Sequence, residues 1–290
     1  MQDVFESTRI FREMCTKSDT ERDKGLTTPE DITRFDGIVY GKDEKWQSLD
    51  VYRPKAAEEK LPVIVSVHGG GWVYGTKEVY QFYCMNLAQR GFAAVNFNYR
   101  LAPENRFPAS LEDTDAVFGW IKANADKYGF DLDNVFAVGD SAGAFLLAVY
   151  ACILTNPALA ESYAKYFSPA GMKLKGIGLN CGLYTTESND QSLEAYLPEE
   201  GREDALRLLD SVSHITKDFP PAYILTSNGD FLAKAPEVLI KSLERNGVSY
   251  TFKLYGSNEN TLYHIFHCNI KTADAKEAND DECGFFKALI

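Results

Sequence analysis

A serine in a tight, glycine-flanked turn is the residue of this chain whose type and setting best suit covalent chemistry. Ser141 lies in Gly139-Asp-Ser-Ala-Gly143, between an apolar run and a stretch rich in helix formers. The pattern G-x-S-x-G is typical of a nucleophile elbow, a strand, turn and helix that lift the hydroxyl clear of a sheet. The glycines are needed because a side chain at either position would collide with the strand or the helix. The alternative is an ordinary helix N-cap.

A serine nucleophile needs a base to remove its proton, and the chain has four histidines. His68 precedes the serine and belongs to a glycine-rich stretch. His214 lies in a polar segment and comes before the candidate acid, Asp230. His264 and His267 both follow the last expected strand. His264 is the favoured base and His267 is its rival.

The base in turn needs a carboxylate that orients it, and Asp230 in Ser227-Asn-Gly-Asp230 follows a buried run. In one recurrent chain order the acid lies between the nucleophile and the histidine, as Asp230 does. The alternative is a turn residue beside Gly229, since aspartate often hydrogen-bonds its own backbone there.

Three glycines in His68-Gly-Gly-Gly-Trp72 follow the apolar run 61–67. Consecutive glycines at the end of a buried strand cost backbone entropy, which indicates that the backbone must approach something closely. In acyl transfer that partner is the oxyanion of the tetrahedral intermediate. An ordinary glycine-rich turn is the alternative, whereas the G-x-G-x-x-G and G-K-[ST] patterns of phosphate loops do not occur here.

The composition bounds the class of protein. The chain has 290 residues, which suffice for one large α/β domain or two smaller ones, and one domain with an added lid is expected. With 45% hydrophobic and 25% charged residues, it can bury a sizeable core. A net charge of -12 argues against nucleic acid or an anionic membrane as partners. Without a membrane-length apolar run or a basic, apolar leader at Met1, we expect no membrane insertion and a cytoplasmic location.

The cysteines lie far apart, without C-x-x-C spacing or paired histidines nearby. We expect free thiols and neither disulfides nor metal ligands. They are Cys15, Cys84, Cys152, Cys181, Cys268 and Cys283.

Strands and helices alternate along most of the chain, which predicts a mostly parallel, doubly wound sheet with an antiparallel beginning. Ligands of such sheets bind at the carboxyl ends of the strands. A polar, acidic segment at 184–219 is placed to act as a lid. Strands are expected at 33–41, 48–52, 61–67, 92–98, 135–138, 176–183, 220–227 and 248–255, and helices at 78–89, 110–128, 142–150, 201–212, 236–246 and 273–286.

From about Thr33 onward the chain resembles the bacterial hormone-sensitive-lipase-like (family IV) carboxylesterases of the α/β-hydrolase fold. The resemblance rests on four motifs that occur in the family's order and spacing. They are His68-Gly-Gly-Gly-Trp72, Tyr99-Arg-Leu-Ala-Pro-Glu104 followed by Phe107-Pro108, Gly139-Asp-Ser-Ala-Gly143, and Pro220-Pro221 with Asp230.

The resemblance implies a role for each matching position. Ser141 would be the nucleophile, Asp230 the acid and His264 the base. The backbone N–H groups of Gly70, Gly71 and Ala142 would form the oxyanion hole. Residues 33–290 would form the hydrolase domain, and residues 1–32 together with an insertion at 184–219 would form a cap.

Two positions depart from the family pattern. The usual His-Gly-Phe appears as His264-Ile-Phe266, which leaves His267 as a weaker rival. A third elbow glycine is replaced by Ala144, inside the helix.

The implied function is a serine carboxylesterase that hydrolyses short-chain acyl esters through a triad and an acyl-enzyme. No cofactor or metal is required, the partner is a small-molecule ester, and the resemblance is compatible with a homodimer. A peptidase or amidase would use the same triad. A ligand-binding relative of the fold without catalysis is the other alternative.

Overall fold

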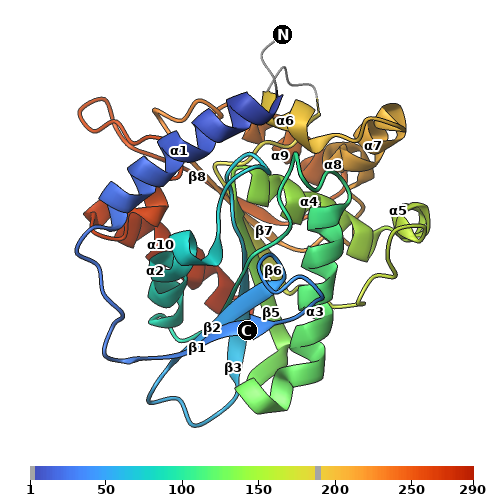
Figure 1. Cartoon of the computed structure of the whole chain (residues 1–290). Coiled ribbons are helices and arrows are strands. Elements are labelled where there is room, and N and C mark those ends of the chain that lie inside the picture. Colours follow the sequence, from blue (N-terminus) through green and yellow to red (C-terminus); the bar gives the residue numbers. More distant parts are fainter. Residues whose placement is uncertain (1–3, 187–190) are drawn as a thin grey trace.

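One sheet runs through the protein in the computed structural model, which describes residues 4–186 and 191–290 (Figure 1). Within these residues the sheet has eight strands in the order β1-β2-β4-β3-β5-β6-β7-β8. β2 is antiparallel to β1 and β4, and all other neighbours are parallel, so the expected mixed sheet is confirmed. The strands are β1 Ile32–Val39, β2 Ser48–Pro54, β3 Leu61–Val67, β4 Ala93–Phe97, β5 Phe130–Asp140, β6 Gly176–Asn180, β7 Ala222–Ser227 and β8 Tyr250–Tyr255.

Helices cover both faces of the sheet, so its central strands are buried on both sides. Val63 and Val65 of β3 belong to the core formed with α3, α4 and α9, whereas Ile64 packs in the core formed with α2 and α10. The helices are α1 Val4–Asp23, α2 Lys77–Ala88, α3 Ala109–Tyr128, α4 Ala142–Thr155, α5 Pro157–Tyr163, α6 Gln191–Tyr196, α7 Arg202–Leu209, α8 Ser211–His214, α9 Pro236–Arg245 and α10 Ala273–Lys287, with a 3₁₀ turn η1 Phe266–Cys268.

Some expected boundaries were wrong. β5 begins at Phe130, before the predicted 135–138. β6 ends at Asn180 because Cys181 has a φ of 48°, which turns the chain out of the sheet. The helix predicted at 201–212 is two helices, since Asp210 leaves helical geometry at ψ 78°. The helices α5 and α6 were not predicted, because six or seven residues carry too little periodicity to be recognised.

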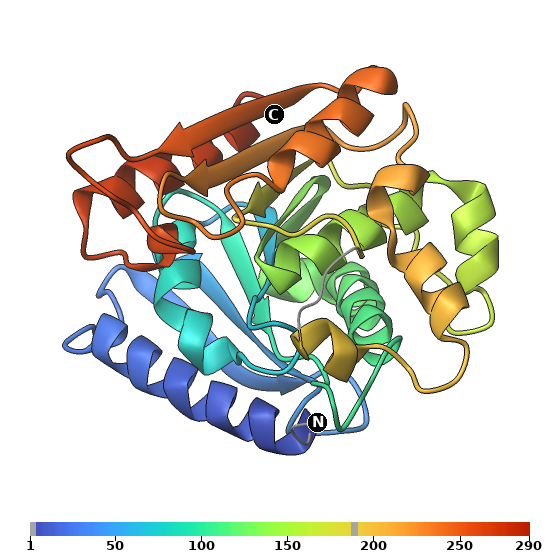
Figure 2. The same ribbon diagram turned by 90° about the horizontal axis from the view of Figure 1, so that it is seen from above.

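The N-terminal helix α1 lies across the carboxyl edge of the strands (Figure 1). Seen from above, α6 lies near the N-terminal end of α1, and α7 and α8 lie to one side (Figure 2). α1 contacts α6, whereas α8 contacts α4 and α9. The proposed cap therefore has two differently placed parts, and its residues 1–3 and 187–190 lie outside the described residues.

Two arginine side chains of α1 form hydrogen bonds with the loop after β3 and with α2. Arg12 donates to the carbonyl of Val73 at 2.7 Å and forms two hydrogen bonds of 2.7 Å with the Glu104 carboxylate. Arg22 donates to the carbonyl of Val79 at 2.8 Å. Because these charge-assisted hydrogen bonds hold α1 at its middle and near its C-terminal end, the helix forms a wall tied to the loop after β3 and to α2.

Within the described part of the chain no single helix combines the length and hydropathy needed to cross a membrane, and the bent pair α4 and α5, at 110°, meets that test on length and composition alone. All six cysteines are free thiols, as expected.

A buried carboxyl beneath the sheet makes stability depend on pH. Glu282 of α10 is fully buried and accepts hydrogen bonds from Asn180 at 2.8 Å and Tyr83 at 3.2 Å. Burial raises its pKa from 4.5 to about 7. Between these values the folded protein holds a proton that the unfolded chain has lost, so this group lowers stability as pH rises.

We expect Glu282→Gln to become more stable relative to the wild type as pH rises from 5 to 8, by on the order of 3 kcal/mol. Urea unfolding at both pH values measures this difference. Glu277→Gln, on an exposed position of the same helix, is the control and should leave the pH dependence unchanged. Parallel pH curves for wild type and Glu282→Gln would show that the carboxyl does not titrate in this range.

Candidate active site

The turn between β5 and α4 forces Ser141 into an unusual backbone conformation, with φ 52° and ψ −119°. Its N–H donates to the carbonyl of Asn180 at 2.9 Å, which ties the turn to the end of β6. A Cβ on Gly143 would lie 2.0 Å from the carbonyl oxygen of Val67, and one on Gly139 would lie 2.6 Å from the backbone of Gly143. The predicted reason for both glycines is thus confirmed.

We expect Gly143→Ala to destabilise the protein by about 3 kcal/mol or more, because the added methyl group meets backbone that cannot move aside. Thermal or urea unfolding measures the loss. Gly284→Ala is the matched control, since this glycine lies in α10 with no heavy atom within 4 Å of an added Cβ. It should be neutral or stabilising by about 0.5–1 kcal/mol. Equal effects of the two substitutions would contradict the packing argument.

A histidine joins the serine to a buried carboxylate. His264 Nε2 lies 3.0 Å from Ser141 Oγ, and its Nδ1 lies 2.8 Å from Asp230 Oδ1. Burial alone would raise the pKa of Asp230, but the hydrogen bond and charge of His264 outweigh it, so this pKa lies below its ordinary value. The structure therefore brings together the three side chains that the sequence singled out.

Asp230 is also the turn residue that the alternative interpretation described. Its Oδ1 accepts the N–H of Leu232 at 2.8 Å, and its Oδ2 accepts the hydroxyl of Thr226 at 3.0 Å. These hydrogen bonds fix the carboxylate toward His264. The turn at Asp230 and its hydrogen bond to His264 are thus one arrangement.

The rival histidine lies elsewhere. Ile265 has a φ of 53°, so residues 264–267 do not continue as one helical turn. His267 is fully buried and packs edge-on against Tyr83, with ring centroids 5.3 Å apart. Burial lowers the pKa of His267 to about 3, which keeps this ring neutral.

The glycine loop after β3 faces the serine. Gly70 and Gly71 have φ values of 108° and 60°, and a Cβ on Gly70 would lie 2.2 Å from the carbonyl oxygen of Tyr74. Both glycines and Ala142 line the same pocket as Ser141. Ala142 is the first residue of α4, so its N–H is among those that the helix itself does not satisfy.

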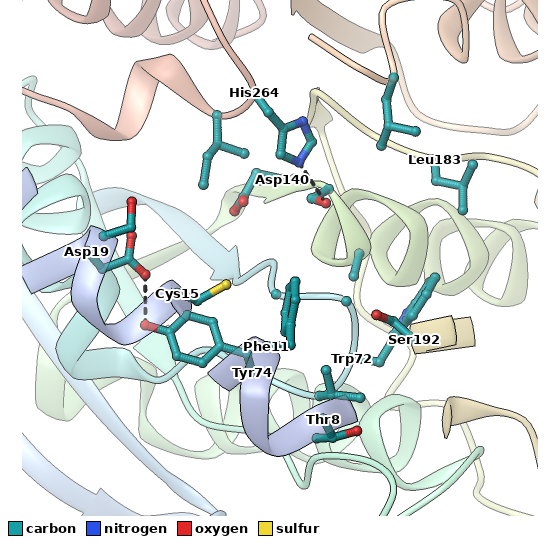
Figure 3. A pocket seen from close by; sticks show the side chains of 18 of the residues that line it. Thr8, Phe11, Cys15, Asp19, Trp72, Tyr74, Asp140, Leu183, Ser192 and His264 are labelled. Atoms are coloured by element: carbon teal, nitrogen blue, oxygen red, sulfur yellow. Dashed lines mark hydrogen bonds between the residues drawn. The ribbon is translucent and has the colours of Figure 1, made fainter. Parts of the chain in front are cut away.

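The pocket has a volume of about 590 Å³, within the range of small-molecule sites (Figure 3). One wall comes from α1, where Phe11, Cys15 and Asp19 point into it, and Asp19 accepts a hydrogen bond from Tyr74 at 2.8 Å. Among the described residues of the expected lid 184–219, Ser192 lines the pocket, and α7 and α8 do not.

Sequence reasoning missed several lining residues. Residues 1–32 carry a helical pattern and were expected in the cap, but its lining positions were not singled out. Ser7, Phe11, Cys15 and Ser18 recur at helical spacing on one face of α1. Asp140 lies at a variable position of the serine motif, so the G-x-S-x-G pattern does not mark it.

Three donor atoms, on Cys181, Asp230 and His264, lie within 4.8 Å of one another. This set does not fit a metal ligand sphere. Both ring nitrogens of His264 already face Ser141 and Asp230, and burial raises the pKa of the Cys181 thiol well above its ordinary value. The sulfur is therefore a weakly ligating thiol.

Known proteins with similar sequences include esterases. The BD-FAE family model matches residues 49–237. An acetyl esterase of Salmonella dublin is 27% identical over 250 residues, which are 83% of this chain and 76% of that protein. Esterase LipC of Mycobacterium tuberculosis is 34% identical over 122 residues, which are 41% of this chain and only 30% of that esterase.

Solved structures show the same architecture. A crystal structure of esterase B from Lactobacillus rhamnosis with a C6-C4 SN3 inhibitor has a TM-score of 0.91 and 26% identity, and it covers 99% of this chain and 97% of that one. EstE1, a thermophilic carboxylesterase from a metagenomic library, has a TM-score of 0.77 and 22% identity, with 97% of each chain covered.

Proposed function

The chain belongs to the BD-FAE family, whose model matches residues 49–237, and from this premise we propose that it hydrolyses short-chain acyl esters with Ser141 as nucleophile. It is a carboxylic ester hydrolase of the α/β-hydrolase fold, similar to the hormone-sensitive-lipase-like esterases. The proposal assigns His264 as the base and Asp230 as the acid.

One observation carries the proposal: a single imidazole lies within hydrogen-bond distance of both Ser141 Oγ and the Asp230 carboxylate. With its Nδ1–H donated to Asp230, His264 presents a lone pair on Nε2 to the serine hydroxyl. As Ser141 Oγ bonds to the ester carbonyl carbon, Nε2 takes the hydroxyl proton. The imidazolium is stabilised by the adjacent carboxylate.

The tetrahedral intermediate then collapses. The carbonyl re-forms, the bond to the alcohol oxygen breaks, and His264 gives its proton to the leaving alcohol. Water repeats the sequence on the acyl-enzyme, which releases the acid and restores Ser141. The N–H groups of Gly70, Gly71 and Ala142 are proposed to hold the oxyanion in both halves, at about 3 to 4 kcal/mol each.

The size of the pocket supports a short acyl group. Its volume of about 590 Å³ must hold both the acyl and the alcohol part, beneath the wall that α1 forms. Similar proteins include an acetyl esterase and an esterase B structure with a tributyrin phosphonate inhibitor.

Hydrolysis of p-nitrophenyl acetate, butyrate and octanoate beside an aminoacyl anilide tests the proposal. We expect kcat/KM for butyrate to exceed that for octanoate by at least about 10-fold and turnover of the anilide to be far slower. A faster anilide reaction would favour the peptidase or amidase. Binding without turnover would favour a ligand-binding relative of the fold.

We propose that α1 and α6 form the cap over the pocket, within residues 1–32 and 184–219. Removal of residues 1–23 is expected to change the kcat/KM ratio of octanoate to acetate esters by about 10-fold or more, because α1 supplies one wall. Phe11→Ala makes a smaller change in the same wall. Arg9→Ala, on the exposed face of α1, is the control. If the shortened, folded protein and Phe11→Ala kept the wild-type profile, α1 would not shape the substrate range.

Two further proposals concern the protein's setting. A homodimer is tested by light scattering, which should give twice the chain mass of 32.4 kDa. A cytoplasmic location is supported by six free cysteines, which suit a reducing compartment.

A further inference from the structure

Two buried polar residues outside the triad connect the serine turn to the glycine loop. The hydroxyl of Tyr80, on α2, donates to Asp140 Oδ2 at 2.7 Å and accepts the N–H of Gly69 at 3.1 Å. Tyr80 is 4% exposed and Asp140 is 3% exposed. A continuous chain of hydrogen bonds therefore runs from the residue before Ser141 to the first glycine of the loop.

The peptide groups around Gly69 are held from two directions. Its carbonyl accepts the Nδ1–H of His68 at 2.8 Å, and the His68 ring stacks on Tyr99 with centroids 4.1 Å apart. Burial lowers the pKa of His68 to about 4, so the ring is neutral at pH 7. A Cβ on Gly69 would lie 2.4 Å from Asp140 Oδ2, which shows how closely the loop and the serine turn meet.

We propose that Asp140 and Tyr80 are positioning residues for ester hydrolysis: they fix the Gly69 peptide and thereby direct the N–H groups of Gly70 and Gly71 toward the oxyanion that forms at Ser141. This inference rests on the proposed function of Ser141. A displacement of about 1 Å in such donors is enough to slow catalysis about 10²-fold, which is why a rigid support matters.

The charge of Asp140 strengthens this support. Burial raises its pKa to about 6, and Asp140 lies close to His264 in the pocket wall (Figure 3). At pH 8 it is a carboxylate, to which the Tyr80 hydroxyl makes a charge-assisted hydrogen bond. The polarised hydroxyl oxygen is then a better acceptor for the N–H of Gly69.

Steady-state kinetics with p-nitrophenyl butyrate at pH 8 test the inference. We expect Tyr80→Phe and Asp140→Ala each to lower kcat by about 10- to 100-fold with KM within about 2-fold of wild type. The double variant should lose little more than either single one, since both break the same chain. Asp140→Asn keeps an acceptor for Tyr80 and should retain at least about a third of the wild-type kcat.

Tyr83→Phe is the matched control, because Tyr83 is also a buried tyrosine of α2 but donates to Glu282, away from the loop. It should lose a similar amount of stability in thermal unfolding while kcat stays within about 2-fold. If Tyr80→Phe does not fold, the contrast between Asp140→Ala and Asp140→Asn decides the question alone.

Several results would overturn the inference. They are a Tyr80→Phe kcat equal to that of Tyr83→Phe, a loss that appears in KM alone, or equal losses in Asp140→Asn and Asp140→Ala. These results leave the proposed function intact as long as Ser141→Ala is inactive. An active Ser141→Ala would instead refute the proposed function itself.

Discussion

Ser141→Ala is expected to lower kcat for p-nitrophenyl butyrate by at least about 10⁴-fold while the protein stays folded. The serine oxygen is the atom proposed to form the acyl-enzyme, and the alanine side chain offers no nucleophile in its place. The alanine keeps a Cβ, so the backbone at φ 52° is no more strained than in the wild type. Initial rates and a thermal unfolding curve measure the two parts of this prediction.

Ser18→Ala is the control, since Ser18 lines the same pocket from α1. It should keep kcat within a few-fold of wild type. A Ser141→Ala protein that retained more than about 1% of the wild-type kcat would remove the nucleophile assignment. A loss that accompanied unfolding would show in the melting curve and would not count as support.

His264→Ala is expected to lower kcat by at least about 10³-fold, as loss of a triad base does. The imidazole is the group that links Ser141 Oγ at 3.0 Å to Asp230 at 2.8 Å. Without it, the serine hydroxyl has no base, and the Asp230 carboxylate loses its partner. The KM should change much less, because the substrate's binding wall is intact.

His267→Ala separates the two histidines of the loop. This ring is buried against Tyr83 and lies outside the pocket lining, so kcat should stay within about 5-fold. Stability should fall by about 1–3 kcal/mol, because a cavity replaces a packed ring. An inactive His267→Ala beside an active His264→Ala would require the base to be reassigned.

The serine turn and the turn at Asp230 were accessible from sequence because each depends on local chemistry, whereas His264 was assigned from chain order and the family resemblance. Gly139 and Gly143 are required by backbone contacts, and Asp230 closes a local turn with Leu232. Apolar runs marked the central strands, and β3 was predicted with its observed bounds.

Features set by distant contacts were not accessible. Tyr80 and Asp140 meet only because the fold brings α2 beside the end of β5, so nothing in their 60-residue separation indicates a pair. The separation of His264 from His267 depends on the positive φ of Ile265, a β-branched residue for which that conformation is rare. The position of α1 over the pocket depends in part on hydrogen bonds from Arg12 and Arg22 to the backbone carbonyls of Val73 and Val79, which sequence patterns do not mark.

Covalent labelling tests the central claim most directly. A p-nitrophenyl alkylphosphonate ester would be attacked at phosphorus by Ser141 Oγ, with release of p-nitrophenolate and a stable phosphonyl-enzyme. Peptide mass spectrometry should find one label per chain, on Ser141, in proportion to lost activity, and none on Ser141→Ala. Full inactivation of the enzyme with Ser141 unmodified would contradict the account.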